Sequence, residues 1–143
     1  MMEPGQVAES LRDALVEFGR DGERARSPCS QSSYDRDVLF RDPLQTPRGR
    51  GAFLTMNRRV LGRARPLSFD VKDVIGGRDS LCLAWTTYEM PLGPTLVFEG
   101  ATHARVQGGA ITEQRDYWDL LSTVAGSHSL LRHVYAALAP HLG

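Results

Sequence analysis

The segment Ala110-Ile-Thr-Glu-Gln-Arg-Asp-Tyr-Trp-Asp119 has the composition of a β-strand but carries acids next to aromatic residues. Side chains on a strand alternate between its two faces, so Gln114, Asp116 and Trp118 share one face. If that face lines a pocket, the Asp116 carboxyl lies beside an indole, away from bulk water. The alternative is that Asp116 pairs with Arg115 or with a neighbouring strand at a solvent-exposed edge.

Three further strand-like segments lie between this one and Pro66, at residues 67–74, 81–90 and 95–106. The four segments are separated by turns rich in glycine and proline, at 76–79, 91–94 and 108–109. Connections this short join strands that pair antiparallel. The second half of the chain is therefore predicted to form an antiparallel meander.

The first half of the chain and its C-terminal end have helical patterns. Apolar residues recur with a helical period over 6–19, less regularly over 23–34, and again over 49–61 and 127–139. A short strand is predicted at 37–42, and it ends at Pro43, which cannot donate a ladder hydrogen bond.

This order of elements predicts an α+β fold. In it, a cone-shaped, curved antiparallel sheet wraps around the N-terminal helices, as in cystatin-like α+β barrels, and a C-terminal helix follows. The 143 residues fit a single domain, with a core at about 7–125 and the C-terminal helix at 126–143. A sheet that curves around helices leaves a conical cavity.

Composition limits the classes of function. The 17 basic and 17 acidic residues sum to zero charge, so no overall field favours nucleic acid or a membrane surface. Seven arginines fall within residues 41–65; a solvated helix face is the favoured interpretation, and a phosphate-rich partner is the alternative. Cys29 and Cys82 are isolated, and the sequence has no secretory signal or membrane-spanning apolar run. We therefore expect a soluble protein of the reducing cytoplasm.

Several spaced motifs together resemble one protein family. They are Tyr34-x-x-Asp37-Val-x-Phe-x-Asp42-Pro43, Gly49-Arg-Gly-Ala-Phe, Trp85, Gly100 and Gly-Gly-x-Ile111-x-x-x-Arg-Asp-Tyr-Trp-Asp119. Over residues 7–125 this pattern is similar to the SnoaL-like branch of the nuclear transport factor 2-like superfamily, which includes ketosteroid isomerases, limonene epoxide hydrolases and polyketide cyclases. The resemblance implies the conical fold but no single reaction, because the superfamily uses one cone for many.

Asp42, before Pro43, resembles the proton-shuttling base of the ketosteroid isomerases. Those enzymes also polarise the substrate carbonyl with a tyrosine on the first helix and a protonated aspartate on a later strand. The matching positions here hold Phe18, or another residue that is not tyrosine, and Thr102. Because such donors supply much of the rate, the resemblance does not extend to steroid isomerisation.

Asp116 resembles the aspartate of the Arg-Asp-Tyr-Phe-Asp run in limonene epoxide hydrolases. Those enzymes also use an Arg-x-Asp pair on an earlier strand, and its positions align with Leu83 and Trp85 here. Without that arginine and that second acid, epoxide hydrolysis by the same mechanism is disfavoured.

The sequence thus keeps one acid from each group of enzymes, Asp42 and Asp116, among aromatic residues. Burial against aromatic surface raises a carboxyl pKa, so one acid can donate a proton near neutrality while the other accepts one. We expect acid/base catalysis without a cofactor on an apolar small molecule, by isomerisation, cyclisation or epoxide opening.

Further candidates complete the predicted site. His103 is a third catalytic candidate, although strand alternation directs it away from Thr102. The residues expected to contact the ligand are Tyr34, Phe40, Trp85, Glu89, Thr102, Gln114 and Trp118. The other histidines lack zinc-site spacing and no glycine-rich phosphate loop follows a strand, so neither a metal nor a nucleotide cofactor is expected.

The alternative function is non-catalytic, as a carrier of a hydrophobic small ligand or as a dimerisation module. The outward face of the meander, with Tyr88, Leu96 and Phe98, is apolar enough to need cover, which predicts a homodimer. DNA binding through residues 41–65 is disfavoured by the neutral charge balance. Catalysis requires that Asp42 and Asp116 face one cavity.

Overall fold

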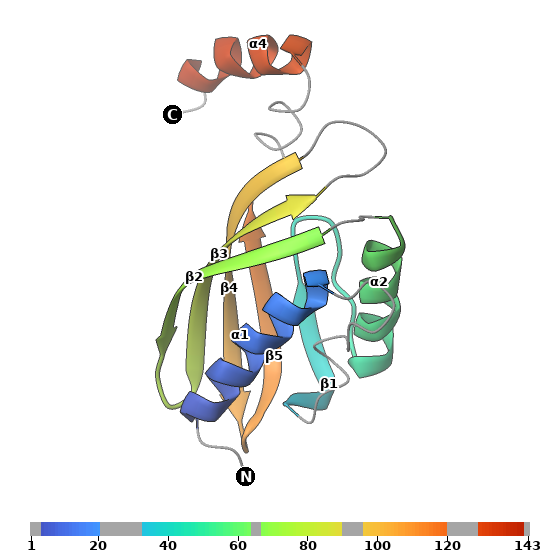
Figure 1. Ribbon diagram of the computed structural model, residues 1–143, viewed down its shortest axis with the longest axis vertical. Helices are drawn as coiled ribbons and strands as arrows, with labels where there is room; N and C mark the ends of the chain where they lie inside the picture. The colour runs from blue at the N-terminus through green and yellow to red at the C-terminus, as the bar shows by residue number, and fades with distance from the viewer. Residues whose placement is uncertain (1–3, 21–32, 64–66, 90–95, 120–128, 142–143) are drawn as a thin grey trace.

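The computed structural model describes residues 4–20, 33–63, 67–89, 96–119 and 129–141 (Figure 1). In chain order its elements are helix α1 (Pro4–Arg20), strand β1 (Tyr34–Arg41), helix α2 (Arg50–Arg63), strands β2 (Leu67–Gly76), β3 (Ser80–Glu89), β4 (Leu96–Gln107) and β5 (Ala110–Trp118), helix α4 (Ser129–Leu138) and the short 3-10 helix η2 (Ala139–His141). The predicted α+β fold and the C-terminal helix are confirmed.

Five strands form one sheet in the order β1-β5-β4-β3-β2. The strands β2 to β5 are the predicted antiparallel meander. By contrast, β1 pairs parallel to β5, so the sheet is mixed and the expectation of a wholly antiparallel sheet is wrong at this edge. Helix α2 and the meander separate β1 from β5 in the chain, and a connection of this length lets the two strands run in the same direction.

Helix α1 packs against the curved sheet, and α2 lies beside β1 (Figure 1). The apolar stripe of α1 places Val7 and Leu11 in the core, α2 adds Phe53, and β3 adds Leu81 and Leu83. All five side chains are buried. Full burial of one such side chain contributes roughly 1.5–3 kcal/mol, so this core holds the helices against the sheet.

β1 begins at Tyr34, where the sequence predicts the end of the helix at 23–34; the residues of that segment before Ser33 lie outside the described part. The Ile111 N–H donates to the Ser33 carbonyl over 2.6 Å, and Tyr34 pairs with Ile111. Between Tyr34 and Leu39 the register shifts. Tyr34 is therefore extended because a strand distant in sequence binds this segment, which local periodicity cannot reveal.

The sequence predicts an apolar surface on the outward face of the sheet, and the structure shows another on α4. Leu130, Val134 and Leu138 form an exposed apolar stripe along α4, although no described helix is long and apolar enough to cross a membrane. The side chains of Tyr88, Leu96 and Phe98, from which we predict a homodimer, lie outside the described part. The homodimer stays a prediction.

Candidate active site

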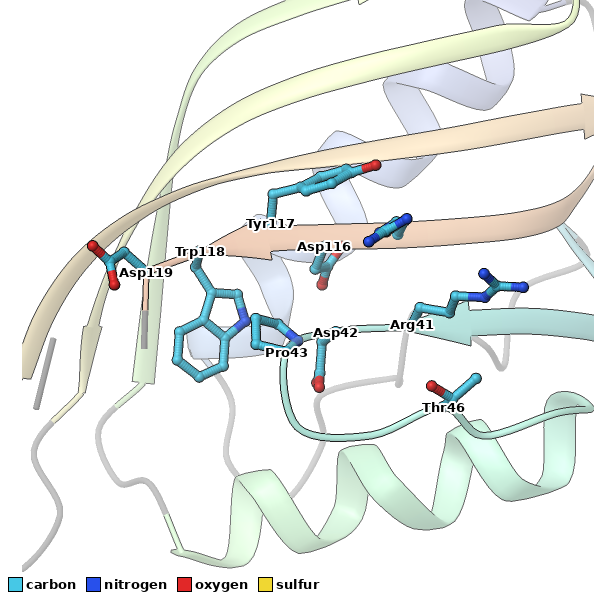
Figure 2. Close-up of a pocket in the computed structure, with 9 residues that line it drawn as sticks. Arg41, Asp42, Pro43, Thr46, Asp116, Tyr117, Trp118 and Asp119 are labelled. Atoms are coloured by element: carbon cyan, nitrogen blue, oxygen red, sulfur yellow. The ribbon is translucent and has the colours of Figure 1, made fainter. Parts of the chain in front are cut away.

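A pocket of about 660 Å³ opens where β1 parts from β5 (Figure 2). The last pair between these strands is Arg41 with Arg115, and the chain then turns away toward α2. β5 continues to Trp118 with no described strand on that side, so side chains from both of its faces reach the opening. The lining residues are Arg41, Asp42, Pro43, Thr46, Arg115, Asp116, Tyr117, Trp118 and Asp119.

Asp42 holds the turn that follows β1. Its Oδ1 atom accepts the backbone N–H groups of Leu44 and Gln45 at 2.7 and 2.8 Å, and its Oδ2 atom accepts the Gln45 side-chain amide at 3.3 Å. The chain then doubles back along β1, where the Gly49 N–H donates to the Val38 carbonyl and glycine allows a φ of 85°. Asp42 is therefore a half-buried acid whose oxygens are bound by its own loop.

Asp116 ends a hydrogen-bond network that runs through the sheet. Its Oδ1 atom accepts the Thr102 hydroxyl at 2.7 Å and the Gln114 side-chain amide at 3.1 Å. Thr102 accepts the indole N–H of Trp85 at 2.9 Å, and Gln114 accepts the Tyr34 hydroxyl at 2.6 Å. An indole N–H can only donate, so the Thr102 hydroxyl accepts from Trp85 and donates its own hydrogen bond to Asp116. The four supporting side chains are buried.

Gly100 makes the contact between Trp85 and Thr102 geometrically feasible. It pairs with Trp85 on one side and Trp118 on the other. A Cβ atom added at Gly100 would lie 2.4 Å from the Trp85 ring, far inside any real contact. The indole therefore lies directly over the glycine backbone and reaches Thr102 on the next strand, which explains why this motif position holds glycine.

Burial raises the pKa of Asp116 from its usual 3.8 to about 6. The hydrogen bonds from Thr102 and Gln114 lower the pKa because they favour the charged form, and the negative charge of Asp42 raises it. Figure 2 shows the Asp116 side chain directed from β5 toward the loop that carries Asp42. The Oδ2 atom has no partner among the described residues, so this oxygen is available to a ligand.

The structure brings most of the predicted site residues together. Asp42, Asp116 and Trp118 line the pocket. The buried partners that hold Asp116 are also predicted site residues, namely Tyr34, Trp85, Thr102 and Gln114. These four side chains hold Asp116 in place through the hydrogen-bond network and do not line the pocket.

Phe40 and His103 do not line the pocket, and the side chain of a third predicted residue, Glu89, lies outside the described part. Phe40 is in the core, where its ring stacks on Phe53 with centroids 4.6 Å apart. His103 lies next to Thr102 on β4, so its side chain points to the opposite face, where its strand neighbours are Cys82 and Arg115. Glu89 is the last residue of β3, and its side chain lies outside the described part.

The lining is more polar than the sequence suggests. Arg41, Arg115 and Asp119 line the opening together with Thr46 and Tyr117, none of which is a predicted site residue. Strand alternation alone directs Arg115 and Tyr117 away from Asp116; they reach the pocket because it opens at an edge of β5. Among the described residues, no three His, Cys, Asp or Glu side chains are grouped to hold a metal ion.

Known proteins share this fold. A family model described as SnoaL-like domain matches residues 31–114. A protein of ketosteroid isomerase-like fold from Catenulispora acidiphila, in complex with trimethylamine, is 18% identical with a TM-score of 0.71, over 83% of this chain and 92% of that one. An LEH-like epoxide hydrolase from M. tuberculosis is 17% identical with a TM-score of 0.71, over 96% and 98%. A candidate SnoaL-like polyketide cyclase from Jannaschia sp. CCS1 is 13% identical with a TM-score of 0.68, over 89% and 97%.

At these identities the likeness establishes the fold and not the chemistry. No curated protein matches the sequence.

Proposed function

The chain belongs to the family of SnoaL-like domains, and on that premise we propose that its pocket is an acid/base active site for a small molecule, with Asp116 as the proton donor and acceptor. The reactions that fit are isomerisation, ring closure and epoxide opening. Structures of similar fold include one epoxide hydrolase and one candidate polyketide cyclase, which supports this range of chemistry.

One observation carries the proposal: Asp116 lines the pocket, and burial raises its pKa to about 6. General acid/base catalysis is most efficient when the pKa of the group lies near the working pH, because both protonation states are then populated. An exposed aspartate, with a pKa of about 4, is too weak a base and too rarely protonated for this role at neutral pH.

The hydrogen bonds decide which oxygen carries the proton. Oδ1 already accepts hydrogen bonds from Thr102 and Gln114, so an acidic proton resides on Oδ2. Protonated, Oδ2 can donate to a carbonyl or epoxide oxygen of the substrate. Ionised, it can take a proton from a C–H or O–H group. The two bonds to Oδ1 keep the carboxyl in one orientation in both states.

Asp42 has a different part in the proposal. Three donors of its own turn engage its two oxygens, so we assign it to holding the loop beside the pocket. Its charge also raises the pKa of Asp116. In this assignment Asp42 raises the pKa of the reactive acid and does not itself react with the substrate, unlike the division of roles that the sequence suggests.

Turnover of a panel of cyclic unsaturated ketones and epoxides tests the proposal. Asp116→Asn keeps the shape of the side chain, and we expect it to lower kcat/KM by about 10²–10⁴. Asp70→Asn, at an exposed position of β2, is the matched control and leaves the rate unchanged. In the wild type, kcat/KM changes with an apparent pKa of about 6. Full activity of Asp116→Asn would remove Asp116 from the mechanism.

A second candidate function is ligand binding without catalysis. It is favoured by the engagement of Asp42 in its turn and by the trimethylamine complex of the similar Catenulispora acidiphila protein. In that case no compound of the panel is turned over, and Asp116→Asn alters only affinity.

A further inference from the structure

Arg41 and Arg115 stand directly opposite each other at the last pair between β1 and β5. Both are exposed, and both line the pocket. Residues paired in this way project to the same face of the sheet, and like charges at opposed positions destabilise a strand pair. Two arginines at this position are therefore unfavourable for the isolated fold.

Neither Asp42 nor Asp116 neutralises the two guanidinium groups. The salt bridges in which both residues are described join Lys72 to Glu99 and Arg105 to Glu113. Neither Asp42, which is bound by its turn, nor Asp116, which is bound by the network on the opposite face, makes a salt bridge with either arginine. A local conflict that the fold leaves unresolved beside a pocket is typical of a binding position.

The aromatic ring of Tyr117 holds one of these arginines in place. The Arg115 guanidinium carbon lies 4.8 Å from the centre of the ring, within the range of a cation–π contact. Figure 2 shows that the Arg41 side chain starts at the end of β1 and runs back alongside that strand. A guanidinium that is already positioned loses less conformational entropy when it binds a planar anion.

We propose that Arg41 and Arg115 bind an anionic group, a carboxylate or a phosphate, of the molecule that occupies this pocket. The anion would lie between two guanidinium groups that otherwise repel each other, and bidentate contacts to such groups are strong. The pocket volume of about 660 Å³ accommodates both the anionic group and a larger body reaching toward Asp116. The inference rests on the proposed function only in making this molecule the substrate, and it adds an anionic group to the apolar substrate that the sequence suggests.

Calorimetric titration of the purified protein tests the inference with three probes: naphthalene-2-carboxylate, its neutral carboxamide, and inorganic phosphate. We expect the carboxylate to bind at least about tenfold more tightly than the carboxamide. In Arg41→Gln/Arg115→Gln this preference disappears, while the carboxamide affinity is unchanged. Arg58→Gln, at an exposed position of α2 outside the lining, keeps the preference.

Displacement of the carboxylate by phosphate identifies the better anion. Equal affinity for carboxylate and carboxamide, loss of both in the double variant, or no binding of any probe at millimolar concentration would each overturn the inference.

A thermal melt provides a second measurement that does not need a bound aromatic body. Because relief of the repulsion between the arginines offsets loss of the contact of Arg115 with Tyr117, the double variant melts no lower than the wild type, and phosphate raises the melting temperature of the wild type alone. A lower melting temperature for the double variant without phosphate would mean that the arginines serve the fold.

The failure of this inference can be told apart from failure of the proposed function. Asp116→Asn keeps the preference for the carboxylate if the anion site stands, whether or not turnover is lost. Turnover that needs Asp116 but shows no dependence on Arg41 and Arg115 would retain the catalytic proposal and discard the anion site.

Discussion

Asp42 and Asp116 line the same pocket, but the chain holds them in different ways. Asp42 is bound by groups two and three residues further along its own turn. Asp116 is bound by Thr102 of β4 and Gln114 of β5, which are in turn bound by Trp85 of β3 and Tyr34 of β1. One acid depends on local geometry, and the other depends on the register of four strands.

The hydrogen-bond network bears on the electrostatics of Asp116. The network places Asp116 where burial raises its pKa to about 6. Residue type alone does not distinguish a structural acid from a reactive one. The structural acid and the reactive acid are distinguished by the partners of each carboxyl and by how far along the chain those partners lie.

The largest effect on the Asp116 network is expected from Gly100→Ala. The added methyl group would overlap the Trp85 ring, so the indole must move and its bond to Thr102 breaks. Overpacking of this severity destabilises a fold by about 3 kcal/mol, which urea unfolding measures. Gly51→Ala is the control, because no atom lies within 4 Å of the added group, and it leaves stability equal or higher. An unperturbed Trp85 N–H resonance in Gly100→Ala would contradict the close packing.

Asp116→Asn is expected to change how stability depends on pH. Asp116 binds its proton more tightly in the folded chain than in the unfolded chain, so wild-type stability falls as pH rises from about 4 to about 6. The variant lacks this loss of stability, and its amide oxygen can still accept the hydrogen bonds that Thr102 and Gln114 donate to Oδ1 in the wild type. Relative to the wild type it gains about 2 kcal/mol between pH 4 and pH 8, allowing for solvent screening.

Urea unfolding of both proteins at the two pH values measures this gain. Asp70→Asn, at an exposed position of β2, keeps Asp116, so its stability falls with pH as that of the wild type does. A stability difference between Asp116→Asn and wild type that is constant with pH would show that burial leaves the Asp116 carboxyl unaffected.

Local patterns predict the parts of the molecule that depend on neighbours in sequence. Glycine- and proline-rich turns predict the meander of β2 to β5, and alternation predicts that Gln114, Asp116 and Trp118 share a face. The resemblance carried by the motifs indicates Asp42 and Asp116 as acids of one site. Both acids line the pocket.

The rest depends on pairings that have no local signal. The parallel pairing of β1 with β5 sets Arg41 opposite Arg115 and opens the pocket at the edge of β5. Strand alternation alone places Arg115 on the face of β5 opposite Asp116 and so predicts that it lies away from the pocket, which it in fact lines. The hydrogen bond from Trp85 to Thr102 likewise requires the β3–β4 register together with Gly100. The sequence therefore predicts that Trp85 contacts the ligand, whereas its side chain is buried and holds Thr102.

A smaller effect is expected from Thr102→Val, which has nearly the same shape but no hydroxyl. Asp116 loses a donor that favours its charged form, so its pKa rises further. The Trp85 N–H loses its acceptor, and an unsatisfied buried donor costs about 1–2 kcal/mol. The carboxyl ¹³C resonance of Asp116, followed by NMR titration, measures the pKa. Thr112→Val, at a half-buried position on β5, leaves it unchanged, and a lower pKa in Thr102→Val would contradict the network.

The smallest effect is expected from Asp42→Asn. The amide oxygen still accepts the two backbone N–H groups of the turn, so the stability loss stays below about 1 kcal/mol. Removal of the charge lowers the pKa of Asp116, which is opposite in sign to the effect of Thr102→Val. The same NMR titration measures both variants. Opposite signs would separate the effect of charge from that of hydrogen bonding, whereas shifts of equal sign would mean that both substitutions act by loosening the pocket.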